Sequence, residues 1–218
     1  MKAVKAVIFD MDGLMIDSER VGEEIYLKIA PQMGIEMTRE IYRSFTGTDL
    51  NNVLRVLRQH FPEADNEELI RRVEAAKLEV RRAGGVPAKK GLYELFDYLE
   101  EKQIRKIVAT SSSRELAQTV LEKLDIFSRL DGGVYAGEVK AAKPEPDVFL
   151  KALEIAGTAP SEAIILEDSY NGIRAANNAG IDVIMIPDLL PPLAGLSTLA
   201  VLEDMTQVIK FLEKGECV

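Results

Sequence analysis

Short, continuous runs of apolar residues recur along the chain and are bounded by polar residues. This pattern is typical of parallel strands that are buried on both faces of a sheet. The strand-like runs are residues 7–9, 104–109, 133–135, 163–166 and 183–186. Segments with helical spacing of apolar residues lie between and after them, at residues 92–101, 115–124, 146–156, 171–178 and 206–213. Strands that alternate with helices predict an α/β fold with a doubly wound, mostly parallel sheet.

The segment between the first strand and the rest of this pattern has a different character. Residues 16–85 carry helical periodicity and almost no strand signal. Capping residues predict four helices there, which begin near Asp17, Thr38, Asp49 and Asn66. We therefore expect an all-helical domain of residues 16–85 inserted into an α/β core of residues 1–15 and 86–218. Two connections near glycines join them, and this geometry suits a lid.

Polar side chains follow several of the predicted strands at the point where each strand ends. Asp10 and Asp12 follow the first strand, Thr110 and Ser111 the second, and Glu167 and Asp168 a later one, while Lys143 stands in a further loop. The carboxyl ends of parallel strands meet at one edge of a sheet, where ligands bind. We therefore expect these groups to converge into a cluster of four carboxylates with one lysine, which indicates a site for a cation and a phosphate group.

Each of these signals also has a plainer interpretation. Asp12 and Gly13 can form a turn, Glu167 and Asp168 can cap a helix, and a lone lysine on a loop is usually solvated. The two carboxylate pairs, however, end the two strands with the strongest buried character. Carboxylates brought together repel unless a cation neutralises them, and hard oxygen ligands favour Mg²⁺. Zinc is disfavoured, because the single histidine, His60, lies in the helical insertion.

Composition narrows the classes of partner. Hydrophobic residues make up 47% and charged residues 29% of the 218 residues, as in soluble globular proteins. The net charge of −9 opposes nucleic acid or an anionic membrane as partner. One cysteine, Cys217, allows no internal disulfide, and the apolar run at residues 6–9 is too short for a signal peptide. We expect a cytoplasmic monomer that acts on a small molecule.

Four ordered motifs resemble those of the haloacid-dehalogenase-like superfamily. They are residues 10–13 (Asp-Met-Asp-Gly), Thr110, residues 143–147 (Lys-Pro-Glu-Pro-Asp) and residues 167–169 with Gly172. The resemblance spans nearly the whole chain and implies a Rossmann-like sheet. The helical insertion after the first motif is similar to that of the beta-phosphoglucomutase-like and sugar-phosphate phosphatase branch.

This resemblance implies a role for each motif residue. Asp10 would be the nucleophile, Asp12 the general acid and base, and Thr110 and Lys143 the phosphate-binding residues. Glu167 and Asp168 would bind Mg²⁺ together with the Asp10 carboxylate and the Asp12 carbonyl group.

The helical insertion is expected to select the substrate. Glu19, Thr48 and Lys77 are candidates to face it, although solvated positions are the default for such residues. The arginine pairs at residues 71–72 and 81–82 could steer an anionic substrate.

The resulting hypothesis is a Mg²⁺-dependent phosphatase of a small phosphorylated metabolite, a sugar phosphate in particular, with an aspartyl-phosphate intermediate. A phosphomutase is the main alternative. Mutases of the family carry a histidine twelve positions after the nucleophile, and this chain has Gly22 there. A non-enzymatic phosphoacceptor domain of the receiver type is a third possibility, but such a domain needs no helical lid.

Overall fold

The computed structural model describes residues 3–48 and 50–214. A six-stranded parallel sheet forms the core, with the strand order β3-β2-β1-β4-β5-β6. Its strands are β1 (Ala6–Phe9), β2 (Arg105–Ala109), β3 (Gly132–Val134), β4 (Ala163–Glu167), β5 (Asp182–Met185) and β6 (Ala200–Val201). The predicted doubly wound α/β class is confirmed. Asp49, near which the third inserted helix was expected to begin, and Cys217, the single cysteine, lie outside the described residues.

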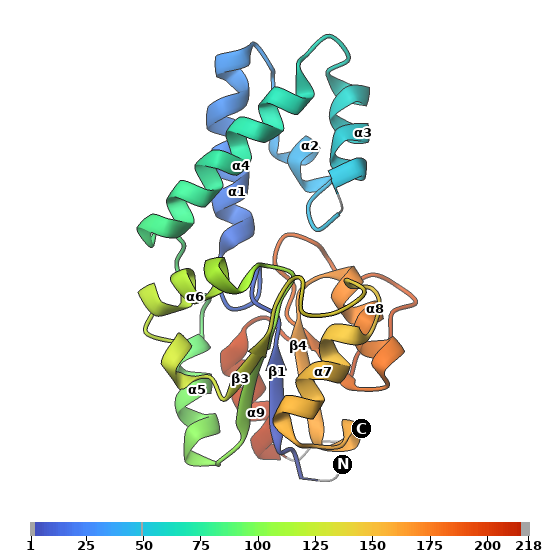
Figure 1. Cartoon of the computed structure of the whole chain (residues 1–218). Coiled ribbons are helices and arrows are strands. Elements are labelled where there is room, and N and C mark those ends of the chain that lie inside the picture. Colours follow the sequence, from blue (N-terminus) through green and yellow to red (C-terminus); the bar gives the residue numbers. More distant parts are fainter. Residues whose placement is uncertain (1–2, 49, 215–218) are drawn as a thin grey trace.

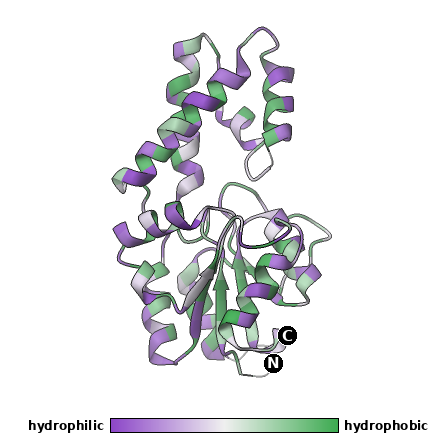
Figure 2. Cartoon of the chain, viewed as in Figure 1, coloured by the Kyte–Doolittle hydropathy of each residue, from purple (hydrophilic) through white to green (hydrophobic). Residues whose placement is uncertain are grey.

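Helices cover both faces of the sheet. Those that follow the helical insertion are α5 (Leu92–Glu101), α6 (Arg114–Lys123), α7 (Asp147–Ala156), α8 (Tyr170–Ala179) and α9 (Met205–Lys214). In β1, Val7 and Phe9 face the core cluster beneath α5, α6 and α9, whereas Ala6 and Ile8 face the cluster beneath α7 and α8. Alternate residues thus enter opposite cores, and for this reason the strand is continuously apolar (Figure 2).

The four remaining helices lie together over the carboxyl edge of the sheet (Figure 1). They are α1 (Ser18–Ile29), α2 (Arg39–Arg43), α3 (Leu50–His60) and α4 (Asn66–Ala83). They have their own core, in which the rings of Tyr26, Tyr42 and Phe45 pack with centroids 5.3–5.4 Å apart. We call these helices and their connecting loops the cap.

Local sequence signals set most helix ends. The Thr38 side chain accepts a hydrogen bond from the Ile41 amide and begins α2, and Asp65 does the same for α4. Gly84 ends α4 in the left-handed conformation with φ of 78°. The caps predicted at Thr38 and at the start of α4 are therefore confirmed within a residue, whereas Asp17 makes no side-chain capping bond.

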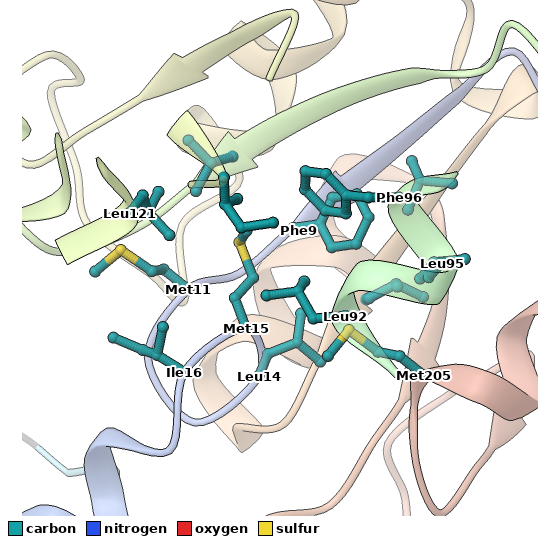
Figure 3. Packing of buried hydrophobic residues seen from close by; sticks show 14 of the residues in the cluster. Phe9, Met11, Leu14, Met15, Ile16, Leu92, Leu95, Phe96, Leu121 and Met205 are labelled. Carbon is teal, nitrogen blue, oxygen red and sulfur yellow. The ribbon is translucent and has the colours of Figure 1, made fainter. Parts of the chain in front are cut away.

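The segment after β1 is anchored by apolar side chains. Met11, Leu14, Met15 and Ile16 are fully buried in the core cluster. Figure 3 shows Leu14 and Met15 beside Phe9 and Leu92, and Met11 beside Leu121. This packing fixes the loop that carries Asp10 and Asp12. No helix of the described part of the chain is long and apolar enough to cross a membrane.

Candidate active site

Asp10 lies at the carboxyl end of β1, on the floor of a pocket between the core and the cap. Its carboxylate accepts a hydrogen bond from the Lys143 ammonium at 2.5 Å, and the residue is only 8% exposed. Burial raises its pKa to about 7, an effect that nearby Glu167 reinforces and that Lys143 offsets only in part. The structure therefore holds this carboxylate where its negative charge is costly unless further positive charge is supplied.

Lys143 reaches into the site from the loop between β3 and α7. Its ammonium contacts Asp10, Glu167 Oε1 at 2.6 Å and the Ala109 carbonyl oxygen at 3.1 Å. Burial alone would lower the pKa of this lysine, but the two carboxylates outweigh burial, so the net shift is upward. The lysine is a fixed positive charge at the ends of β1, β2 and β4.

Glu167 is completely buried at the end of β4. Its Oε2 accepts hydrogen bonds from the backbone amides of Asp168 and Ser169, at 3.0 and 2.9 Å, and from the Ser169 hydroxyl at 3.0 Å. A Cβ atom at Gly172 would lie 1.7 Å from Glu167 Oε1, so the glycine makes room for the carboxylate. This close approach gives a physical reason for glycine in the fourth motif.

Asp168 completes a group of three carboxylates with Asp10 and Glu167, each of which offers an oxygen within 4.8 Å of the others. Asp168 Oδ1 is buried without a hydrogen-bond partner, and burial raises the pKa of this carboxyl group well above its usual range. A Cβ atom at Gly13 would lie 2.2 Å from Asp168 Oδ2. Clustered hard oxygen donors with one unpartnered buried oxygen fit a divalent cation such as Mg²⁺.

Asp12 lies at the same pocket, but its carboxylate is not a member of this group of three. Its Oδ2 accepts a hydrogen bond from the Ser112 hydroxyl at 2.7 Å, and its Oδ1 accepts one from Arg81 at 2.5 Å. The Asp12 side chain remains at the pocket and is 24% exposed. Arg81, expected to steer substrates, thus contacts a site carboxylate directly.

The loop between β2 and α6 forms another wall of the pocket. Thr110 is buried, and its hydroxyl oxygen accepts a hydrogen bond from the Ser112 amide at 3.0 Å. Ser111 lines the pocket, and Ser113 caps α6. Hydroxyl groups and free amides before a helix suit an anion.

The pocket has a volume of about 390 Å³ and is lined by both the core and the cap. The structure brings Asp10, Asp12, Glu19, Thr48, Thr110, Ser111, Lys143 and Asp168 to its walls. Sequence reasoning missed other lining residues, namely Thr46, Ser169, Asn171, Leu189 and Leu190. The two leucines belong to an irregular loop after β5 that carries no motif. Ser169 could have been predicted, because it is part of the fourth motif.

Lys77 lines a second cavity, of about 450 Å³, whose lining residues all belong to the cap. Glu19, Gly47 and Thr48 line both cavities, so the two adjoin. Burial raises the pKa of Glu19, whose carboxylate accepts a hydrogen bond from the Tyr42 hydroxyl at 3.0 Å. The cap candidates Glu19, Thr48 and Lys77 therefore lie above the carboxylate site.

The fold and the site define a class of protein: a doubly wound α/β protein with a carboxylate and lysine centre beneath a helical cap. A model of the haloacid dehalogenase-like hydrolase family matches residues 7–186. The chain belongs to this family, as the four motifs predicted.

Several relatives are named as phosphatases. The chain is 31% identical to the phosphorylated carbohydrates phosphatase of Thermotoga maritima, over 83% of this chain and 84% of the relative. It is 28% identical to the validoxylamine A 7'-phosphate phosphatase of Streptomyces hygroscopicus subsp. limoneus, over 94% and 95% of the two chains. The crystal structure of a superfamily hydrolase from Geobacter sulfurreducens superposes with a TM-score of 0.72 at 27% identity, over 96% of each chain.

Proposed function

We propose that this protein is a Mg²⁺-dependent phosphatase that hydrolyses a small phosphorylated metabolite, a sugar phosphate in particular, through an aspartyl-phosphate on Asp10. One observation carries the proposal. The buried Asp10 carboxylate and the Lys143 ammonium meet on the pocket floor, beside two further carboxylates. The named phosphatases among the relatives support the same assignment.

In the first chemical step, a carboxylate oxygen of Asp10 attacks the phosphorus atom. The bond between phosphorus and the leaving oxygen breaks, and its electron pair stays on that oxygen. The carboxyl group of Asp12, which lines the same pocket, gives the leaving oxygen a proton. Such proton transfer contributes about 10²–10⁴-fold to the rate.

In the second step, a water molecule attacks the phosphorus of the aspartyl-phosphate. Asp12 accepts a proton from this water, and the bond to Asp10 breaks to release phosphate and restore the carboxylate. Splitting one displacement into two makes each easier. Throughout both steps, Lys143 holds positive charge beside the transferring group, and the hydroxyl-bearing loop at Thr110 and Ser111 offers donors to its oxygens.

Asp10, Glu167 and Asp168 would hold the Mg²⁺ ion through their carboxylates. When bound, the ion supplies positive charge that offsets the repulsion between these carboxylates and the substrate phosphate. The unpartnered Asp168 Oδ1 supports this assignment.

The cap would act as the lid and the specificity element, with residues 16–85 moving relative to the rest of the chain. Glu19, Thr48 and Lys77 would contact the leaving group. The adjoining cavity of about 450 Å³ offers room for a leaving group that extends beyond a single small ring. We further propose that the enzyme acts as a cytoplasmic monomer, in line with its charge of −9 and its single cysteine.

A phosphomutase is the alternative, and the surroundings of Gly22 speak against it. A Cβ atom at Gly22 would lie 2.6 Å from the Tyr42 hydroxyl oxygen and 3.2 Å from Lys77 Cε. These two side chains fill the space that a histidine would need. The cap therefore has no imidazole at this position to activate an acceptor sugar, and water is the expected acceptor.

Phosphate release from a panel of phosphorylated metabolites, measured with Mg²⁺, tests the proposal. The same preparation is incubated with beta-glucose 1-phosphate, Mg²⁺ and a trace of the bisphosphate, while glucose 6-phosphate and free phosphate are followed together. A phosphatase releases phosphate faster than it isomerises the sugar. Faster isomerisation would establish a phosphomutase instead. If the protein neither releases phosphate from any substrate nor isomerises the sugar, both assignments are excluded.

A further inference from the structure

Two adjacent arginines lie in the last turn of helix α4, and they contact different partners. Arg81 donates to Asp12 Oδ1 at 2.5 Å, and its side chain is 18% exposed. Arg82 reaches Glu115 at 3.4 Å on the surface, where the two side chains are 59% and 81% exposed. The sequence makes the two residues look equivalent, but only Arg81 touches the site.

Asp12 is held from two directions. The Ser112 hydroxyl, from the core loop before α6, donates to one carboxylate oxygen, and Arg81, from the cap, donates to the other. Both oxygens of the carboxylate are therefore engaged, and its orientation depends on one partner from each part of the molecule. A guanidinium group is well suited to this, because its planar donors fix the direction of a carboxylate.

Arg81, which contacts Asp12, lies at the end of α4 where the chain returns from the cap to the core. It lies three residues before Gly84, where the helix ends. The preceding residue, Val80, packs against both the cap core and the main core cluster. This end of α4 thus rests on the core, and displacing it would carry the guanidinium away from Asp12.

We propose that Arg81 is the positioning residue for Asp12, so that the cap, besides covering the pocket, sets the place of the group that transfers the proton. This inference rests on the proposed phosphatase function. A displacement of about 1 Å in a catalytic group can cost about 10²-fold in rate. Loss of Arg81 should therefore affect the step that needs a proton from Asp12 and spare a step that does not.

Two substrates separate these cases. When the bond to phosphorus breaks, the hexose of hexose 6-phosphate departs as an alkoxide and needs a proton, whereas the p-nitrophenol portion of p-nitrophenyl phosphate departs as a stable phenolate and does not. The ratio kcat/KM reports the first step, phosphoryl transfer to Asp10. For Arg81→Met we expect kcat/KM to fall about 10²-fold on the hexose phosphate and to stay close to wild type on the aryl phosphate.

The matched control is Arg82→Met, which removes the same charge and the same length of side chain from the next position. We expect it to match wild type on both substrates. Arg81→Gln provides a second variant that retains a donor and most of the side-chain length, and thermal unfolding checks that each variant is folded.

The outcomes separate this inference from the proposed function. Selective loss on the hexose phosphate in Arg81→Met or Arg81→Gln, with Arg82→Met unaffected, supports the positioning role. Equal losses on both substrates, equal losses in the Arg81 and Arg82 variants, or no loss overturns it while leaving the phosphatase intact. A wild-type protein that releases phosphate from neither substrate refutes the proposed function itself.

Discussion

Replacing Asp10 by asparagine should abolish turnover and, at the same time, stabilise the metal-free protein. The substitution keeps the volume of the side chain but removes a negative charge that is only 8% exposed. The pKa of Asp10 is raised from its ordinary value of 3.8 to about 7, mainly by burial. The ionised form is therefore disfavoured in the folded chain, and the neutral amide avoids that cost.

The size of the effect follows from this pKa. The difference between 3.8 and about 7 is about three pH units, and each corresponds to about 1.4 kcal/mol, so the ionised carboxylate costs about 4 kcal/mol at pH 8. The pKa of Asp10 is higher in the folded chain than in the unfolded chain. The stability gained by proton binding is therefore present at low pH and is lost as the pH rises through about 7. At pH 5 the cost falls to about 2 kcal/mol.

Thermal unfolding in EDTA measures this effect. At pH 8, Asp10→Asn should unfold about 8–16 °C above wild type, since a chain of this size shifts by about 2–4 °C per kcal/mol. The advantage should shrink at pH 5, and it should also shrink when Mg²⁺ stabilises the wild type. Asp182→Asn, at an exposed position, is the control for the amide substitution. If Asp10→Asn is no more stable than wild type at pH 8, or if the gap does not change with pH, this electrostatic account is wrong.

Three further predictions follow from the site. Chelation with EDTA should abolish phosphate release and Mg²⁺ should restore it, with Ca²⁺ a poor substitute because of its looser coordination; full activity in metal-free enzyme would contradict the carboxylate assignment. Ile70→Trp, which fills the cap cavity, should lower kcat/KM more for a phosphorylated disaccharide than for glycerol phosphate, and equal effects would show that substrates do not enter this cavity. Gly13→Ala should lose activity and Mg²⁺ binding, because the added Cβ would collide with the Asp168 carboxylate. The control is Gly34→Ala, which is also at positive φ but has open space around it and should lose only stability. Similar activity in both variants would exclude the clash.

The strands and their ends could be predicted because periodicity and position act locally. Asp10, Thr110 and Glu167 each end a buried run, and parallel strands bring such ends to one edge. The two-residue strand β6 and the irregular loop before it have no periodic pattern, so they were not predicted. Neither was the contact of Arg81 with Asp12, because it joins residues 69 positions apart through a helix end whose placement depends on tertiary packing.

The identity of the group that carries the phosphoryl intermediate tests the central proposal most directly. Enzyme quenched in acid during turnover of a hexose phosphate is digested, and its peptides are searched by mass spectrometry for the phosphoryl group. We predict that the group lies on Asp10, that it is absent from Asp10→Asn, and that it disappears when substrate is exhausted. A phosphoryl group on Ser111 or another residue, or steady turnover without any on Asp10, would contradict the account.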